Sequence, residues 1–117
     1  MWRFWRATLN SWNGLKAAIR SEQAIREEAV AFALSLPASW LVGTTAARRV
    51  ELVAVILLLI AVELLNTAVE KLADRVTTDH DRQIGYVKDV GSAAVGVTLL
   101  IAVLVWGFAL AERIGLL

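Results

Sequence analysis

The sequence predicts an all-α integral membrane protein with an N-terminal amphipathic surface helix and three transmembrane helices. Hydrophobic residues make up 58% of its 117 residues, whereas a soluble domain has roughly 45–50%. They are concentrated in three blocks, and a basic segment rich in tryptophan precedes the first block. The length fits a single domain. We expect this domain over residues 1–117, the surface helix over about 2–22, and the spans over about 24–43, 50–76 and 90–111.

The N-terminal segment has the pattern of a helix that lies on a membrane surface. Trp2, Trp5, Leu9 and Trp12 recur at helical spacing, and basic residues and asparagines occupy the opposite face. A helix of this kind binds in the headgroup region of an anionic leaflet. The alternative, a surface helix packed on a soluble core, is disfavoured by three tryptophans beside four cations. The segment lacks the continuous apolar core of a signal peptide.

A densely charged segment leads into the first span. Ser21 is expected to cap a helix, with Glu22 in its first turn, where a carboxylate is favourable. Glu22 and Arg26 are spaced for an i,i+4 ion pair, worth a few tenths of a kcal/mol. Counted from Gln23, the apolar block reaches the roughly 20 residues that a bilayer requires. Pro37 should kink this helix.

The second span carries a polar face at one end. An unbroken apolar run is followed by five polar residues at steps of three and four: Glu63, Asn66, Thr67, Glu70 and Asp74. At about 100° per residue these side chains fall on one helical face. The span is longer than a bilayer core, so its last turns should protrude into the interface and water. A carboxylate at the end of such an apolar run is costly unless it is paired or functional, which makes Glu63 a candidate functional residue.

The third span follows a polar connection that we expect over 77–87. Its first turns are rich in glycine, alanine and serine, which permit close helix approach in lipid. Nine lysines and arginines lie on the side of the N-terminal helix and the 77–87 connection, and three lie on the other side. This asymmetry places the N-terminus in the cytoplasm, and Trp40 and Trp106 near the opposite interface.

Composition and missing motifs exclude several classes of function. A net charge of +1 argues against nucleic-acid binding, and the absence of cysteine excludes disulfides and thiolate metal sites. Neither a P-loop nor a Rossmann glycine motif occurs. His80 is the single histidine, so a histidine-rich zinc site is excluded, and no serine has the context of a hydrolase nucleophile. Three spans in so short a chain cannot enclose a large cleft, so a sizeable site should require a second subunit.

Four carboxylates are expected at the cytoplasmic interface: Glu22, Glu28, Glu63 and Glu70. Carboxylates without cysteine or paired histidine suit a hard cation such as Mg²⁺, which needs few protein ligands when phosphates share it. Glu63 lies about 10 Å nearer the membrane along the helix than Glu70. Loss of hydration there suits Glu63 to a general base, while Glu70 can stay ionised and bind metal. A lipid hydroxyl could thus reach Glu63 while a nucleotide reaches Glu70.

Three blocks of the sequence resemble the prokaryotic diacylglycerol kinase family. ELLNTAVEKLAD over 63–74 is similar to the family signature, with E, N, T-A, E and D at the same spacing. KDVGSAAV over 88–95 is similar to its K-D-x-G-S-A-A-V block, and SWNGLKAA over 11–18 with E-x-A-I-R-x-E over 22–28 resembles its N-terminal region. The resemblance implies a homotrimeric, multi-pass kinase of the bacterial inner membrane. Such kinases transfer the γ-phosphoryl of ATP, bound with Mg²⁺, to diacylglycerol, giving phosphatidate.

The resemblance also implies a role for individual residues. Glu63 would be the general base on the lipid hydroxyl. Glu22 and Glu70 would hold Mg²⁺ on ATP, and Lys88 would neutralise charge on the transferring phosphoryl. The supporting residues would be Asn66 and Asp74. The further nucleotide-binding residues would be Arg3, Asn10, Asp79, His80, Asp81 and Asp89. The residues beside the lipid substrate, besides Glu63, would be Trp12, Glu28 and Ser92.

Two other functions are compatible with the sequence. Within the family, the lipid alcohol could be undecaprenol, although the E-x-A-x-R-x-E region is more similar to the diacylglycerol branch. In a different class, the chain could be a non-catalytic membrane scaffold. Glu70 and Asp74 would then be solvated charges, Asn66 would join helices through a hydrogen bond, and Lys88 would anchor the end of a span.

Overall fold

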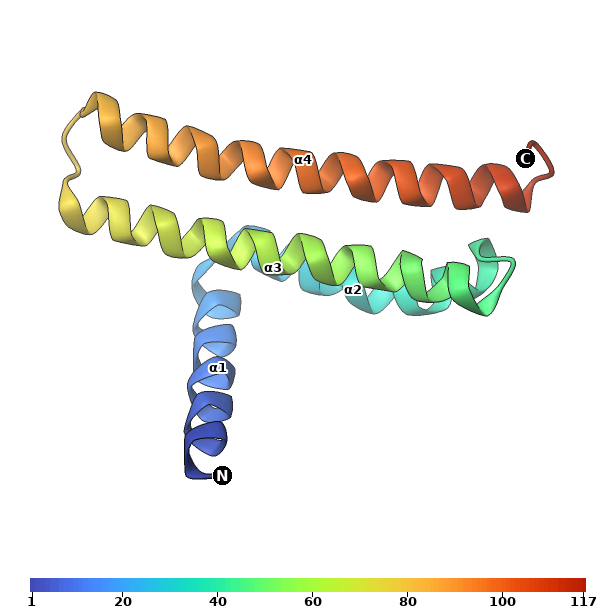
Figure 1. Cartoon of the computed structure of the whole chain (residues 1–117), viewed down its shortest axis with the longest axis horizontal. Coiled ribbons are helices and arrows are strands. Elements are labelled where there is room, and N and C mark those ends of the chain that lie inside the picture. Colours follow the sequence, from blue (N-terminus) through green and yellow to red (C-terminus); the bar gives the residue numbers. More distant parts are fainter.

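The computed structural model describes residues 1–117 and consists of four α-helices without a β-strand. The helices are α1 (Trp2–Ser21), α2 (Gln23–Val42), α3 (Ala46–Val76) and α4 (Arg82–Arg113). Helices α2, α3 and α4 run alongside one another, and α1 projects sideways from this bundle (Figure 1). Helix α3 packs against both α2 and α4, which make little contact with each other. The predicted all-α fold is therefore confirmed, with α3 at its centre.

Helices α3 and α4 are long and apolar enough to cross a membrane. Only 22% of the apolar window of α3 and 17% of that of α4 is buried within the subunit. The core helix of a soluble protein would be mostly buried, so these exposed apolar faces favour a lipid environment. Helix α2, which contains Pro37 and begins with charged residues, is not among the two helices that qualify. A third span over α2 stays a prediction.

Helices α3 and α4 both begin earlier than the predicted spans. Thr45 caps α3, because its side-chain oxygen accepts a hydrogen bond of 3.1 Å from the backbone N–H of Arg48. Asp81 caps α4 in the same way, accepting from the N–H of Ile84 at 3.0 Å. The expected polar connection over 77–87 is therefore wrong in its second half. Hydropathy locates the apolar stretch, whereas the capping residue sets where the helix starts.

The junction between α1 and α2 also differs from the sequence-based expectation. Ser21 is the last residue of α1 and not a cap, and Glu22 is an extended residue between the helices, with φ −117° and ψ 116°. The predicted ion pair between Glu22 and Arg26 is wrong, because Glu22 lies outside the helix that the i,i+4 spacing requires. Arg26 instead donates from Nη1 to the carbonyls of Ile19 at 3.1 Å and Arg20 at 3.0 Å. It thereby satisfies free carbonyls at the end of α1 and fixes the corner.

Small residues and side-chain hydrogen bonds hold the three bundle helices together. Ser35 and Ser39 of α2 are buried, and their hydroxyl groups donate hydrogen bonds to backbone carbonyls of their own helix. Trp106 of α4 donates from Nε1 to the carbonyl of Leu52 on α3 at 3.2 Å. Leu52 is fully buried, so this bond joins α3 and α4 at a buried position. The polar face of α3, which begins at Glu63, lies toward the opposite end of this helix from Leu52.

Candidate functional site

The centre of the candidate site is the polar face of α3. Asn66 is only 8% exposed, and its Nδ2 donates to Glu70 Oε1 at 3.1 Å. This bond fixes one oxygen of Glu70. Glu63 lies two turns nearer the apolar end of the same helix and is half-buried. The periodicity of the sequence predicts this common face, and the prediction is confirmed because α3 is an unbroken helix through the whole stretch.

The corner between α1 and α2 brings Glu22 to α3. Lys71 Nζ lies 3.3 Å from Glu22 Oε1, so an α3 cation holds this carboxylate. A hollow of about 500 Å³ separates the C-terminal half of α1 from α3 beside this pair. Its lining includes Gly14, Ser21, Glu22, Thr67 and Lys71. The pairing of Lys71 with Glu22 could not be predicted from sequence spacing, because it depends on the corner between α1 and α2.

Four carboxylates, which we call the carboxylate cluster, come close enough for their charges to act on one another. The cluster consists of Glu22, Glu28, Glu63 and Glu70. Glu63 is the common member, since the charges of Glu22 and Glu70 act on it, and its own charge acts on Glu28 of α2. Glu28 Oε1 is buried and has no hydrogen-bond partner. Mutual repulsion of this kind is relieved by a bound cation or proton. The cluster is therefore a candidate site for a cation and for a proton.

Helix α4 closes the site on its other side. Lys88 Nζ forms an ion pair of 2.5 Å with Asp74 Oδ1 of α3. One turn further on, Gly91 lies against Asn66, and a Cβ at this position would overlap Asn66 Oδ1. That oxygen is buried and makes no hydrogen bond. Composition distinguishes Gly91 from the neighbouring small residues of α4 in no way. Its position in the K-D-x-G-S block is the one feature of the sequence that indicates a specific role.

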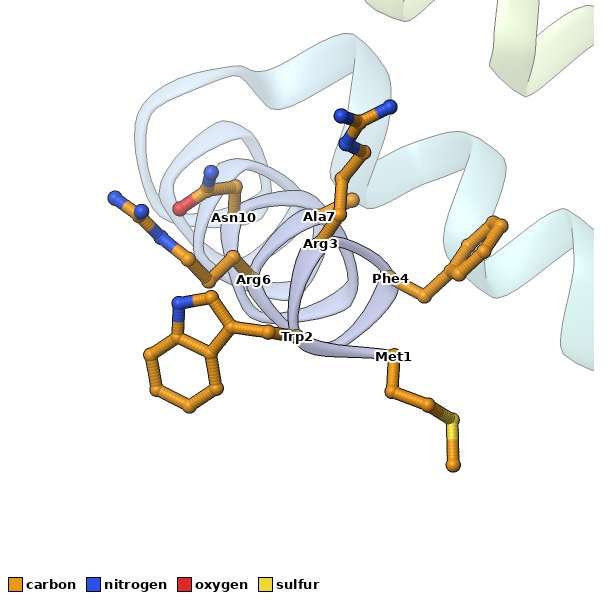
Figure 2. A pocket seen from close by; sticks show the side chains of 7 residues that line it. All are labelled: Met1, Trp2, Arg3, Phe4, Arg6, Ala7 and Asn10. Atoms are coloured by element: carbon orange, nitrogen blue, oxygen red, sulfur yellow. The ribbon is translucent and has the colours of Figure 1, made fainter.

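Other predicted site residues lie apart from the carboxylate cluster. Arg3 and Asn10 line an open hollow of about 800 Å³ around the first turns of α1. Figure 2 shows both projecting from one side of α1, with Met1 and Phe4 on the other side. This end of α1 points away from the bundle (Figure 1). The exposed residues in the connection are Asp79, His80 and Asp81, and those elsewhere are Trp12, Asp89 and Ser92.

The donor set of the cluster matches a hard cation. No group of three or more histidine, cysteine, aspartate or glutamate side chains converges as a preformed metal cage. Glu22 and Glu70 offer carboxylate oxygens, and Asn66 holds only one oxygen of Glu70. Mg²⁺ usually takes one or two carboxylates and completes its octahedron with water and substrate phosphate. The residues thus fit a magnesium ion that arrives with its nucleotide.

Known proteins with related sequences identify the family of this chain. The family model described as prokaryotic diacylglycerol kinase matches residues 9–110. The diacylglycerol kinase of Escherichia coli strain K12 is 37% identical over 105 residues, covering 90% of this chain and 86% of the relative. That of Haemophilus influenzae is 38% identical over 101 residues, covering 86% of each chain. That of Pseudomonas aeruginosa is 36% identical over 104 residues, covering 89% and 85%. The chain belongs to the prokaryotic diacylglycerol kinase family.

Proposed function

We propose that this chain is a kinase that transfers the γ-phosphoryl of ATP to diacylglycerol, giving phosphatidate. It acts at the cytoplasmic face of the bacterial inner membrane, as a homotrimer of subunits that each span the bilayer three times. The observation that carries this proposal is the position of Glu63 and Glu70 on one face of α3, close enough to Glu22 and Glu28 for the charges to interact. The names of the three bacterial relatives support diacylglycerol as the lipid substrate.

Phosphoryl transfer depends on positioning and charge neutralisation more than on covalent chemistry. Glu22 and Glu70 would hold Mg²⁺, which when bound supplies positive charge to the ATP phosphates. The hydrogen bond from Asn66 keeps Glu70 in one orientation for this task. Lys88 would neutralise charge on the transferring phosphoryl, and Asp74 keeps its ammonium in place until substrate arrives. This arrangement performs the task of a P-loop with helix side chains.

Glu63 is proposed as the general base that takes the proton of the lipid hydroxyl. It is half-buried on the membrane side of Glu70, where the hydroxyl of a lipid can approach it from the bilayer. Glu28 faces it from α2, where its buried oxygen has a free acceptor site for a lipid hydroxyl or headgroup. The other residues proposed beside the lipid are Trp12 and Ser92.

The nucleotide would lie on the water side of the cluster. The residues proposed to contact it, besides the metal ligands and Lys88, are Arg3, Asn10, Asp79, His80, Asp81 and Asp89. In one subunit Arg3 and Asn10 line a hollow around the first turns of α1, and the N-terminal end of this helix points away from the bundle (Figure 1). A neighbouring subunit would therefore have to supply them, which supports an oligomer with shared sites. The exposed apolar faces of α3 and α4 provide surface for that assembly.

Transfer of radiolabelled phosphate from ATP tests the proposal. The purified protein in mixed micelles with Mg²⁺ should label diacylglycerol well above undecaprenol. Preferential labelling of undecaprenol would make the chain a polyprenol kinase. Labelling of neither lipid alcohol by a folded protein would favour the non-catalytic scaffold and refute the kinase assignment.

A further inference from the structure

Two adjacent arginines at the end of the bundle opposite the carboxylate cluster have different surroundings. Arg48 is neutralised twice, by Glu51 at 2.7 Å and by Glu112 at 3.1 Å. Arg49 has no carboxylate within ion-pair distance. Its Nε is buried and donates to no acceptor. Arg49 therefore carries a charge and a buried donor that the subunit itself leaves unsatisfied.

The position of Arg49 is fixed by Trp40 of α2 and by Gly43, the residue that follows this helix. Its guanidinium lies 4.2 Å from the ring centroid of Trp40, a cation–π contact. Its stem passes directly over Gly43, where an added Cβ would come within 2.7 Å of Arg49 Cγ. Only a residue without a side chain allows this approach. The guanidinium is thus held in place and does not extend freely into water.

Arg49 lies at the head of an apolar groove between α2 and α3. The groove has a volume of about 470 Å³, within the range of small-molecule binding sites. It runs from Arg49 and Trp40 to Leu57, within the apolar run of α3. Its other apolar lining residues are Leu36, Ala46, Val50, Val53 and Ala54. One cation at the end of an apolar channel matches a molecule with an anionic head and a hydrocarbon tail.

We propose that this groove binds an anionic glycerophospholipid, with its phosphate on Arg49 and an acyl chain along Val53 and Leu57. A guanidinium binds phosphate oxygens through two parallel hydrogen bonds, which would satisfy the buried donor. A second copy of the chain packed here by an apolar face would leave the charge of Arg49 uncompensated in a medium of low dielectric constant. The proposal is independent of the kinase activity, since the groove and the carboxylate cluster lie at opposite ends of α3.

Native mass spectrometry of the full-length protein in detergent tests the proposal with phosphatidylglycerol as the probe. Arg49→Gln removes the charge, and Ala54→Phe fills the groove while Arg49 stays in place. Arg113→Gln is the matched control, because it removes a cation from the last turn of α4 at the same end of the bundle. Retained kinase activity, measured at the distant site, verifies that each variant is folded.

Phosphatidylglycerol should bind roughly tenfold more weakly to Arg49→Gln and to Ala54→Phe than to the wild type, and equally well to Arg113→Gln. Equal binding to the wild type and Arg49→Gln would overturn the proposal. A second result would also overturn it: the wild type retains no phospholipid, and Arg49→Gln has a different oligomeric state from the wild type. That result would make the groove an interface between copies.

Discussion

The contact between Gly91 and Asn66 makes a prediction about how α4 positions the proposed metal ligand. In Gly91→Ala, the new methyl group would overlap Asn66 Oδ1, and it would lie 3.5 Å from Asn66 Cγ and 3.9 Å from Val69 Cγ1. Asn66 is buried, and only two side-chain torsions can reorient its amide, so the amide has little room to move away from the new methyl group. Relief of the overlap requires the amide to rotate or α4 to move outward. Either movement disturbs the 3.1 Å bond to Glu70.

The size of the effect follows from that bond. A hydrogen bond to a charged group contributes about 1.5–3 kcal/mol. The Asn66–Glu70 bond is only part-buried, so we take the lower end of this range, and about 1.5 kcal/mol corresponds to roughly a tenfold change. We therefore expect Gly91→Ala to raise the Mg²⁺ concentration for half-maximal activity about tenfold, with the KM for diacylglycerol unchanged.

Gly96→Ala is the matched control, because it adds the same methyl group to the same helix at a position with no neighbouring atom within 4 Å. It should behave like the wild type. Placing Gly91→Ala in an Asn66→Ala background should cause no further loss, since the overlapped oxygen is already gone. The reasoning fails if Gly91→Ala matches Gly96→Ala in its Mg²⁺ dependence. Additive losses in the double variant would refute it equally.

Three further predictions concern the metal ligands and the helix ends. Glu22→Gln and Glu70→Gln should each raise the Mg²⁺ requirement in steady-state assays, and an unchanged requirement in both would remove these residues as ligands. Asp81→Ala should lower the free energy of unfolding by about 1 kcal/mol through loss of the α4 cap, whereas Asp81→Asn should retain it; equal denaturation curves for the two variants would contradict this. Arg26→Gln should free the α1 carbonyls and speed protease cleavage between α1 and α2, and a wild-type cleavage rate would show that the corner does not depend on Arg26.

Helix positions and helix faces could be predicted from the sequence because they depend on local periodicity. The spacing of Glu63, Asn66, Glu70 and Asp74 determines a common face in any straight helix, and α3 is one. The exact helix ends could not be predicted in the same way. The start of α4 depends on a capping bond from Asp81, and hydropathy carries no information about that bond.

Contacts between helices could not be predicted from the periodicity of the sequence. The pairs Glu22 with Lys71 and Asp74 with Lys88 depend on the corner at Glu22 and on the closeness of α4 to α3. The sequence spacing of Glu22 and Arg26 even favoured a different pair, because that spacing assumes one continuous helix across an extended residue. Family resemblance supplied the residues that periodicity could not group.

Substitution of Glu63 tests the account most directly. Glu63→Gln keeps the size and hydrogen-bonding capacity of the side chain and removes its ability to take a proton. Glu51→Gln, at the other end of α3, is the control for loss of a carboxylate on the same helix. Glu63→Gln should form phosphatidate at least about 100-fold more slowly than the wild type, with unchanged thermal unfolding, because general bases contribute about 10²–10⁴-fold. A rate close to that of Glu51→Gln would contradict the assignment of Glu63 as the base.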